Sequence, residues 1–235
     1  SEYLAQWLIA SKDSIRPKSY IQYRQIVEQH INPMLGHIKL SDLRPEMIQA
    51  AYNKKTAAGT SARTVRLIHS VLRSALNQAL RTALIYRNPA TIVYQPKLKE
   101  TEMKVLNENQ VRSLLIAAKG HRLEALFKLE VTSGLREGEI LGLRWGDLDW
   151  ENHQLKVQRQ LQRVTGMGLV FSEHKSAAGR RMIMLGSETI VSLKAHSSMQ
   201  YAERVFAGEK WQENDLIFPS SVGTPLDPRN LFRQF

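Results

Sequence analysis

The 235-residue sequence contains no cysteine. This absence excludes disulfides, thiolate zinc sites and cysteine nucleophiles. The seven histidines show neither an H-E-x-x-H pattern nor any close paired spacing, so we expect no metal site and no cofactor. Candidate chemistry must therefore be sought among the charged and hydroxyl side chains.

Long apolar runs and a secretory start are also missing. Although 43% of the residues are hydrophobic, no apolar stretch approaches the ~20 residues that a membrane-spanning helix needs. The first residues, Ser1 to Trp7, have neither the basic start nor the apolar stretch of a secretory signal. We therefore expect a soluble, globular, cytoplasmic protein without a membrane anchor.

Negative charge is scarce in the first part of the chain. Residues 1–97 carry 14 Lys/Arg against 5 Asp/Glu, a net charge of +9, whereas residues 98–235 carry 19 against 17, a net charge of +2. An excess of positive charge favours a polyanionic partner such as nucleic acid, although basic surfaces also serve solubility. The asymmetry assigns most contacts with such a partner to the N-terminal part.

The N-terminal part has helical spacing throughout. One helix is predicted over residues 19–31 and ends at Pro33, and another opens at Pro45. The clearest helix covers residues 61–84, with apolar positions three to four apart and arginines on another face. Residues 94–103 are polar and aperiodic, which predicts a linker.

The part that follows mixes helices with strands. Asn107 and Gln110 predict a capping box, with a buried stripe at Val111, Leu114, Leu115 and Ala118. Further helices are expected over residues 122–132, after Gly134 and from Ser187. Two-residue alternation predicts three short antiparallel strands near residues 155–161, 169–171 and 182–185.

These patterns predict a mainly α protein with two domains. Residues 1–97 form an all-helical domain, and residues 98–235 form an α+β domain with a small three-stranded antiparallel sheet. We place the boundary between them near residue 98.

The most informative stretch is T-S-G-L-R-E-G-E-I-L-G-L-R-W-G-D-L-D, residues 132–149. Gly134 permits a tight turn into a helix, which would place Arg136 in the first turn beside free backbone N–H groups that favour a phosphate. Glu139 lies three residues on, where it can hold the guanidinium from behind. Taken alone, such a pair is more often a surface ion pair, worth ~0.3 kcal/mol.

The whole stretch resembles the first active-site box of the tyrosine recombinases, the phage integrase family, with the pattern T-G-L-R-x-x-E-[IL]-x-x-L-x-W-x-D-[IL]. The resemblance implies that Arg136 is a catalytic residue that binds the scissile phosphate. It gives Glu139 a supporting role.

A second stretch, E-H-K-S-A-A-G-R-R-M-I-M-L at residues 173–185, resembles the lysine hairpin of the same family. The resemblance implies that Lys175, at the hairpin tip, is the general acid that protonates the departing 5′ oxygen of the cleaved strand. Arg180 and Arg181 close the hairpin and are expected to contact DNA. A lysine in a turn is otherwise a solvated surface residue.

Upstream, G-T-S-A-R-T-V-R at residues 59–66 resembles the start of the recognition helix in the family's SAM-like core-binding domain, and R-P-K-S-Y at residues 16–20 resembles the opening of that domain's first helix. The alternative is a solvated basic face on an ordinary bundle helix. The DNA-binding candidates implied for this part are Arg16, Lys18, Ser61, Arg63, Thr64, Arg66 and Arg73.

The family pattern is not complete in this sequence. Its members carry an H-x-x-R box and a nucleophilic tyrosine after the lysine, and neither is recognisable here. His196 is followed by Ser-Ser-Met rather than by the arginine of that box, and Tyr201 falls in a helical pattern with Val205 and Phe206 that predicts packing. We therefore expect a C-terminally truncated member that binds DNA without cutting it.

The resemblance implies a site-specific recombinase of a mobile genetic element, which cleaves and rejoins double-stranded DNA through a 3′-phosphotyrosyl link. Its partners would be DNA and further recombinase protomers, in a tetramer for the full-length protein. Two alternatives stay open from the sequence. One is a non-catalytic DNA-binding protein that retains the fold, and the other is a type IB topoisomerase.

Overall fold

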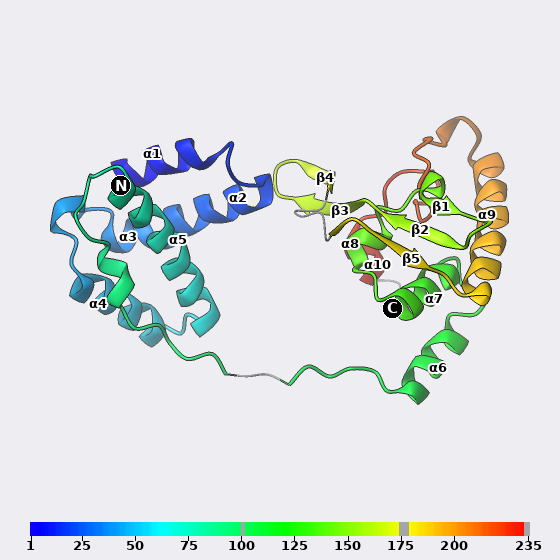
Figure 1. Ribbon diagram of the computed structural model, residues 1–235, viewed down its shortest axis with the longest axis horizontal. Coiled ribbons are helices and arrows are strands. Elements are labelled where there is room, and N and C mark those ends of the chain that lie inside the picture. Colours follow the sequence, from blue (N-terminus) through cyan, green and yellow to red (C-terminus); the bar gives the residue numbers. More distant parts are fainter. Residues whose placement is uncertain (100–101, 174–178, 233–235) are drawn as a thin grey trace. The chain divides into compact units, whose positions relative to one another are not determined.

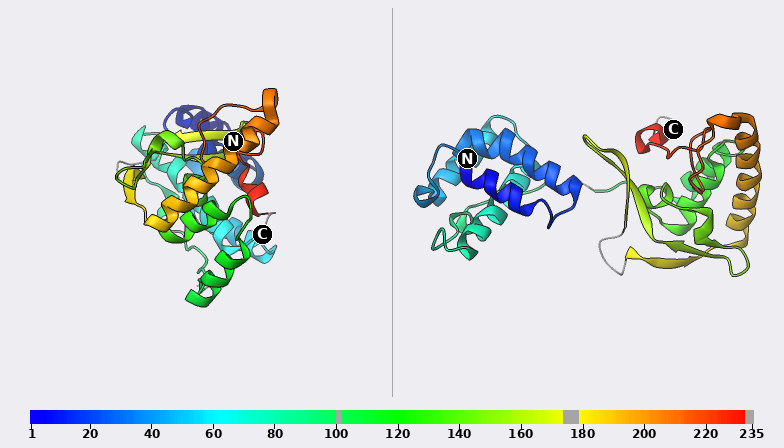
Figure 2. Two further views of the ribbon diagram at one scale, coloured as in Figure 1. Left: turned by 90° about the vertical axis from the view of Figure 1, so that its right-hand side faces the viewer. Right: turned by 90° about the horizontal axis from the view of Figure 1, so that it is seen from above.

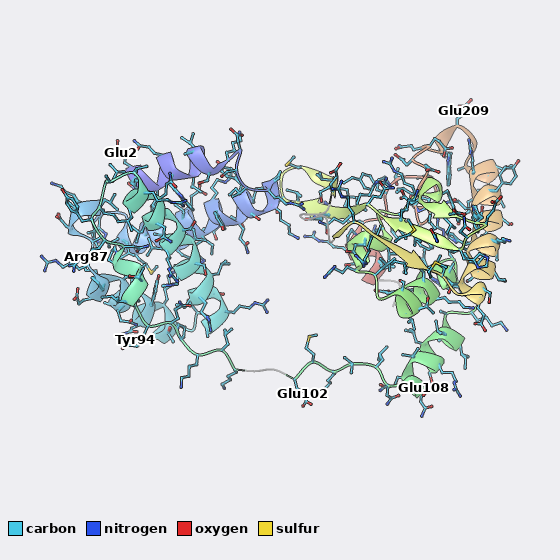
Figure 3. The ribbon with its side chains drawn as sticks, viewed as in Figure 1. Glu2, Arg87, Tyr94, Glu102, Glu108 and Glu209 are labelled. Atoms are coloured by element: carbon cyan, nitrogen blue, oxygen red, sulfur yellow. The ribbon has the colours of Figure 1, made fainter. Side chains whose placement is uncertain are left out.

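A computed structural model describes residues 1–99, 102–173 and 179–232 (Figure 1). The chain divides into two compact units, unit 1 from Ser1 to Met103 and unit 2 from Lys104 to Phe235. The division falls at the end of the polar stretch that the sequence predicts as a linker. Tyr94 and Met103 of this stretch are 83% and 85% exposed, and Figure 3 labels Tyr94 and Glu102.

Unit 1 is built from helices, and its described residues contain no strand, as the sequence predicts. The α-helices are α1 (Glu2–Ser11), α2 (Pro17–Ile26), α3 (Asn32–Leu35), α4 (Pro45–Ala57) and α5 (Ala62–Arg81). A π-helix (Val27–Ile31) joins α2 to α3, and single 3-10 turns lie at Leu40–Asp42 and Pro89–Ile92.

The longest helix of unit 1, α5, is also its most strongly two-sided. Ser61 caps it, because the Ser61 hydroxyl accepts a hydrogen bond of 3.2 Å from the backbone N–H of Thr64. Its buried positions are Val65, Ile68, His69, Val71, Leu72, Ala75, Leu76 and Ala79. The remaining face carries Arg63, Arg66 and Arg73, all exposed. The two faces match the predicted pattern.

The structure of unit 1 differs from the prediction in two places. The helical path does not end at Pro33, because the π-helix widens the chain by one residue and Pro33 then lies near the start of α3, where its missing N–H is tolerated. Helix α1 was not predicted, although Leu4, Trp7 and Leu8 have the three-to-four spacing that buries them in the core.

Unit 2 combines helices with two small sheets (Figure 1). The helices are α6 (Glu108–Ala117), α7 (Glu124–Ser133), α8 (Glu137–Ile140), α9 (Ser187–Ala207) and α10 (Pro228–Phe232). The strands are β1 (Leu148–Asp149), β2 (Gln154–Val157), β3 (Arg159–Val164), β4 (Gly168–Glu173) and β5 (Arg181–Met184). An antiparallel three-stranded sheet has the order β1-β2-β5, which confirms the predicted sheet.

The strands that make up this sheet differ from those expected. The predicted strand is interrupted at Gln158. As a result β2 joins the three-stranded sheet, while β3 pairs with β4 in a separate antiparallel ribbon. The ribbon projects from the rest of unit 2 (Figures 1 and 2). As a consequence β4 and β5, on either side of Lys175, pair with different strands and are not two arms of one simple hairpin.

The core of unit 2 lies among the sheet, α7 and α9. Leu155, Val157 and Leu161 are 0%, 0% and 1% exposed, as their alternation predicts. Leu126 and Leu129 of α7 and Leu193 of α9 pack into the same cluster. Of the helices in the described part of the chain, none combines the length and apolar character that crossing a membrane requires.

Helix α6 lies at the margin of this core. The predicted capping box is present, since the Asn107 side chain accepts from the Gln110 backbone and the Gln110 side chain accepts from the Asn107 backbone, both at 2.9 Å. Of its predicted stripe, however, Ala118 alone is buried, whereas Val111, Leu114 and Leu115 are half-buried.

Candidate active site

The stretch at residues 132–149, here called the arginine box, folds at its start around the buried carboxylate of Glu139. Arg136 is the residue at the N-terminal cap of α8, and Glu139 is the third residue of that helix. One Glu139 oxygen, Oε2, accepts a hydrogen bond of 3.1 Å from the Arg136 backbone N–H, and Oε1 accepts one of 3.0 Å from Arg136 Nη1. The carboxylate therefore holds both the main chain and the side chain of Arg136.

A second guanidinium, that of Arg181 at the start of β5, reaches the same carboxylate. Arg181 Nη2 donates to Oε2 at 2.8 Å and Nη1 donates to Oε1 at 3.3 Å. Burial alone would raise the pKa of Glu139, but the hydrogen bonds from Arg181 and Arg136 outweigh it and lower the pKa to about 2. Glu139 is therefore ionised under all ordinary conditions.

The guanidinium of Arg136 faces solvent although its anchor is buried. The Arg136 side chain is 79% exposed and the Glu139 side chain 2%. An arginine fixed in this way presents its remaining N–H groups in a planar fork that matches two oxygens of a phosphate. Helix α8 has only four residues, and Arg136 caps it rather than lying in its first turn, so the anion-binding group is the guanidinium itself.

Two glycines of the box allow α8 and the turn after it to pack closely against β3. A Cβ at Gly138 would lie 2.8 Å from the carbonyl oxygen of Leu161, and one at Gly142 would lie 3.1 Å from that of Arg159. Helix α8 thus packs directly on the backbone of β3, an approach that only glycine allows. We did not assign this role from the sequence, although the G-x-x-x-G spacing was visible.

A second buried acid of the box, Asp147, forms a clamp of the same kind. Its carboxylate accepts hydrogen bonds of 3.0 Å from the Arg144 backbone N–H and from Gln158 Nε2. Arg159 donates to it through Nη1 at 2.5 Å and Nη2 at 3.3 Å. The end of the box is thereby tied to the bend between β2 and β3. Arg159 was not identified from the sequence, because its partner is 12 residues away.

The expected general acid, Lys175, lies outside the described residues. Arg180, which follows that segment, is exposed. Of the predicted site residues in unit 2, the structure thus brings together Arg136, Glu139 and Arg181. No group of three His, Cys, Asp or Glu side chains that could hold a metal ion occurs in the described part of the chain.

The DNA-binding candidates of unit 1 lie on two helices, α2 and α5. Ser61, Arg63, Thr64, Arg66 and Arg73 belong to the cap or the polar face of α5, and Arg16 and Lys18 flank the start of α2. Helix α5 contains no acidic residue. The polar face of α5 therefore carries uncompensated positive charge.

The two late residues considered from the sequence have different surroundings. His196 is 4% exposed, and its Nε2 donates to the carbonyl of Ile217 at 2.7 Å, so it serves the core. Tyr201 was expected to pack, and this is wrong, since it is 69% exposed on α9. Val205 and Phe206 are likewise 66% and 96% exposed.

The buried His196 predicts a loss of stability in mild acid. Burial lowers the pKa of His196. Its Nδ1 is also buried, and among the described residues no group accepts a hydrogen bond from this atom if it is protonated. The unfolded chain takes up a proton below about pH 6.5, whereas the folded one resists it, so stability should fall as the pH drops through this value. His196→Gln keeps an N–H donor for Ile217 and does not titrate.

Urea unfolding followed by tryptophan fluorescence measures this effect, because three of the four tryptophans, Trp145, Trp150 and Trp211, lie in unit 2. Between about pH 7.5 and pH 5.5 the unfolding midpoint should fall more for the wild type than for His196→Gln. His37→Gln, at an exposed position of unit 1, serves as the control and should behave like the wild type. Equal falls for all three proteins would contradict the prediction.

Comparison with known proteins identifies both units. Residues 1–56 match the family model described as the phage integrase N-terminal SAM-like domain, and residues 104–235 match the model of the phage integrase family. A "Tyrosine recombinase XerC-like" protein of Caldanaerobacter subterraneus subsp. tengcongensis is 30% identical over 94% of this chain and 61% of its own length. An integrase of Saccharopolyspora erythraea is 26% identical over 95% of this chain and 64% of its own. The chain thus spans about three fifths of the length of these curated relatives.

Solved structures show the same fold. The Tn1549 transposon integrase in complex with a circular intermediate DNA matches with a TM-score of 0.80 and 20% identity, over 100% of this chain and 75% of that one. The lambda integrase tetramer bound to a Holliday junction matches with a TM-score of 0.65 and 20% identity, over 99% and 60%. With the family match covering all of unit 2, the chain belongs to the phage integrase family, the tyrosine recombinases.

Proposed function

We propose that this chain is the DNA-gripping and phosphate-binding part of a site-specific recombinase, which cleaves and rejoins double-stranded DNA. The observation that carries the proposal is the exposed guanidinium of Arg136, fixed from behind by the buried Glu139 within the arginine box. A charged fork held in place before its ligand arrives is suited to stabilise the charge that develops on a phosphate during transfer.

In the proposed reaction, a tyrosine hydroxyl attacks the scissile phosphate and forms a 3′-phosphotyrosyl bond while the bond from phosphorus to the 5′ oxygen breaks. Arg136 binds the non-bridging oxygens, and Lys175 gives its proton to the departing 5′ oxygen. The phosphotyrosyl link conserves the energy of the broken bond, so rejoining needs no nucleotide cofactor. Glu139 acts through Arg136.

The distribution of ion pairs supports DNA as the partner of unit 1. Among the described residues, no carboxylate lies within ion-pair distance of any Lys or Arg of residues 1–97, although this part holds 14 of them. In unit 2, by contrast, ion pairs engage Arg112, Arg122, Lys128, Arg136, Arg159, Arg163, Arg181 and Arg204. Eight cations of unit 2 are thus engaged in ion pairs with its own acids, whereas unit 1 leaves its cations available for phosphates.

Binding of this chain to a fluorescent DNA duplex over a range of salt concentrations tests the proposal. The logarithm of the affinity should fall linearly with the logarithm of the salt concentration, with a slope of about −0.9 for each phosphate neutralised. Arg66→Gln and Arg73→Gln should each reduce the slope by about 0.9. Phosphate contacts carry no sequence information, so any duplex serves.

The matched control is Arg112→Gln on α6. Arg112 is also an exposed helical arginine, but Glu108 neutralises it at 3.5 Å, so its replacement should leave the slope unchanged. A complex whose affinity does not depend on salt would refute DNA binding by unit 1. Equal losses for Arg66→Gln and Arg112→Gln would instead show that α5 has no special part in it.

The proposal further assigns the nucleophilic tyrosine to residues of the whole protein other than these 235. Tyr201, the tyrosine that follows Lys175, lies on α9, the helix that carries Leu193 and His196 into the core of unit 2, and the arginine box lies on other elements. These residues alone should therefore bind DNA without cutting it. By analogy with the transposon integrase and the lambda integrase tetramer, we propose a mobile genetic element as the source and further protomers as partners.

A further inference from the structure

Arg181 has a different environment from the other arginines expected to contact DNA. Its side chain is 33% exposed, and both of its terminal nitrogens donate to Glu139. The neighbouring Arg180 is exposed, and so are Arg63, Arg66 and Arg73 of unit 1. Arg181 is therefore already engaged with a buried anion in a two-pronged contact.

Moving the Arg181 guanidinium to a phosphate would leave a largely buried carboxylate with one arginine fewer. Breaking such a pair from one side is costly, because the remaining charge stays desolvated. Arg136 has no such conflict, since it touches Glu139 with one terminal nitrogen and is 79% exposed. The two arginines thus have different roles: Arg181 holds the Glu139 carboxylate, and this carboxylate orients Arg136.

The position of Arg181 in the sheet adds a second link. Arg181 is the first residue of β5 and pairs in register with Val157 of β2, which is fully buried. The segment that contains Lys175 ends at this point of the chain. The contact between Arg181 and Glu139 therefore joins the start of β5 to α8. Through this contact the three-stranded sheet is tied to the arginine box.

From this geometry we infer that Arg181 is a positioning residue rather than a residue that contacts DNA. Its two N–H groups hold the Glu139 carboxylate, and this carboxylate in turn fixes Arg136 for the scissile phosphate. The inference rests on the function proposed above for Arg136. It distinguishes Arg181 from Arg180, whose exposed side chain has no such anchor among the residues that the structure describes.

The first test measures covalent capture of a suicide DNA substrate by the whole protein. Arg181→Gln should slow capture at saturating DNA by about 10- to 100-fold, as is usual when a supporting partner of a functional group is lost. The affinity for DNA and its salt slope should not change. Arg181→Lys should recover part of the rate, because an ammonium keeps the charge but lacks the two-pronged fork.

The control for this test is Arg204→Gln. Arg204 also pairs with a glutamate of unit 2, Glu213, at 2.9 Å, but both side chains are more than half exposed. Capture by this variant should match the wild type. If Arg181→Gln instead lowers the DNA affinity and the salt slope while the saturated rate is kept, Arg181 contacts DNA and the inference is overturned.

The second test needs no catalysis and uses the 235-residue chain. An NMR titration of isotope-labelled glutamate carboxyls should show Glu139 with a pKa of about 2 in the wild type and a clearly higher pKa in Arg181→Gln, with no change in Arg204→Gln. An unchanged Glu139 titration in Arg181→Gln would overturn the inference. Failure of the wild type to capture DNA would overturn the proposed function instead, and the titration would still decide whether Arg181 holds Glu139.

Discussion

Replacing Arg136 with alanine should lower the rate of covalent DNA capture by the whole protein by ~10²- to 10³-fold, the loss typical of a preorganised donor to a charged transition state. The Arg136 guanidinium is the exposed end of a contact whose other end, Glu139, is buried. Its loss removes the positive charge that would face the phosphate, but the Glu139 carboxylate keeps Arg181 as a partner. The fold of unit 2 should therefore survive.

DNA affinity should change little in this variant, because unit 1 carries most of the uncompensated positive charge. Arg136→Lys should retain binding and recover only a small part of the rate, since a single ammonium does not reproduce a planar fork. Arg112→Ala, at another exposed arginine of unit 2, is the control and should capture DNA normally. Capture by Arg136→Ala within about twofold of the wild type would remove Arg136 from the catalytic role.

The pair of Arg136 and Glu139 could be predicted because the two residues are three apart on one chain segment. Helix geometry brings such residues together whatever the rest of the fold does. The partners that complete the two clamps could not be predicted in this way. Arg181 lies 42 residues from Glu139, and Arg159 reaches Asp147 only because the chain bends at Gln158. A pairing of that kind depends on strand register, which the sequence alone did not fix.

The same distinction explains the fold. Local signals predicted the start of α5 near Ser61 and the capping box of α6 at Asn107, because each depends on residues within one turn. The division of one predicted strand into β2 and β3 depends instead on which distant strand each half meets. Tyr201 shows the converse error, since an apolar pattern predicted burial on a face of α9 that nothing in the described chain covers.

Asp147→Ala should cause the largest loss of stability among the changes considered, about 3 to 5 kcal/mol, the cost of removing one partner from a buried ion pair. Asp147 is 5% exposed and the Arg159 side chain 20%, so the orphaned guanidinium would remain largely out of water. The Arg144 backbone N–H and the Gln158 amide would lose their acceptor as well. Asp147→Asn should cost less, because one acceptor oxygen remains.

The exposed pair of Arg204 and Glu213 provides the control, since it also joins an arginine to a carboxylate, at 2.9 Å, but with side chains 55% and 58% exposed. Glu213→Ala should cost no more than about 1 kcal/mol, because water screens such a pair and solvates the arginine left behind. Urea unfolding by tryptophan fluorescence compares the two variants. If their midpoints fall equally, burial does not set the strength of the Asp147 clamp. A large difference would show that the buried carboxylate of Asp147 contributes far more to the stability of unit 2 than an exposed ion pair does.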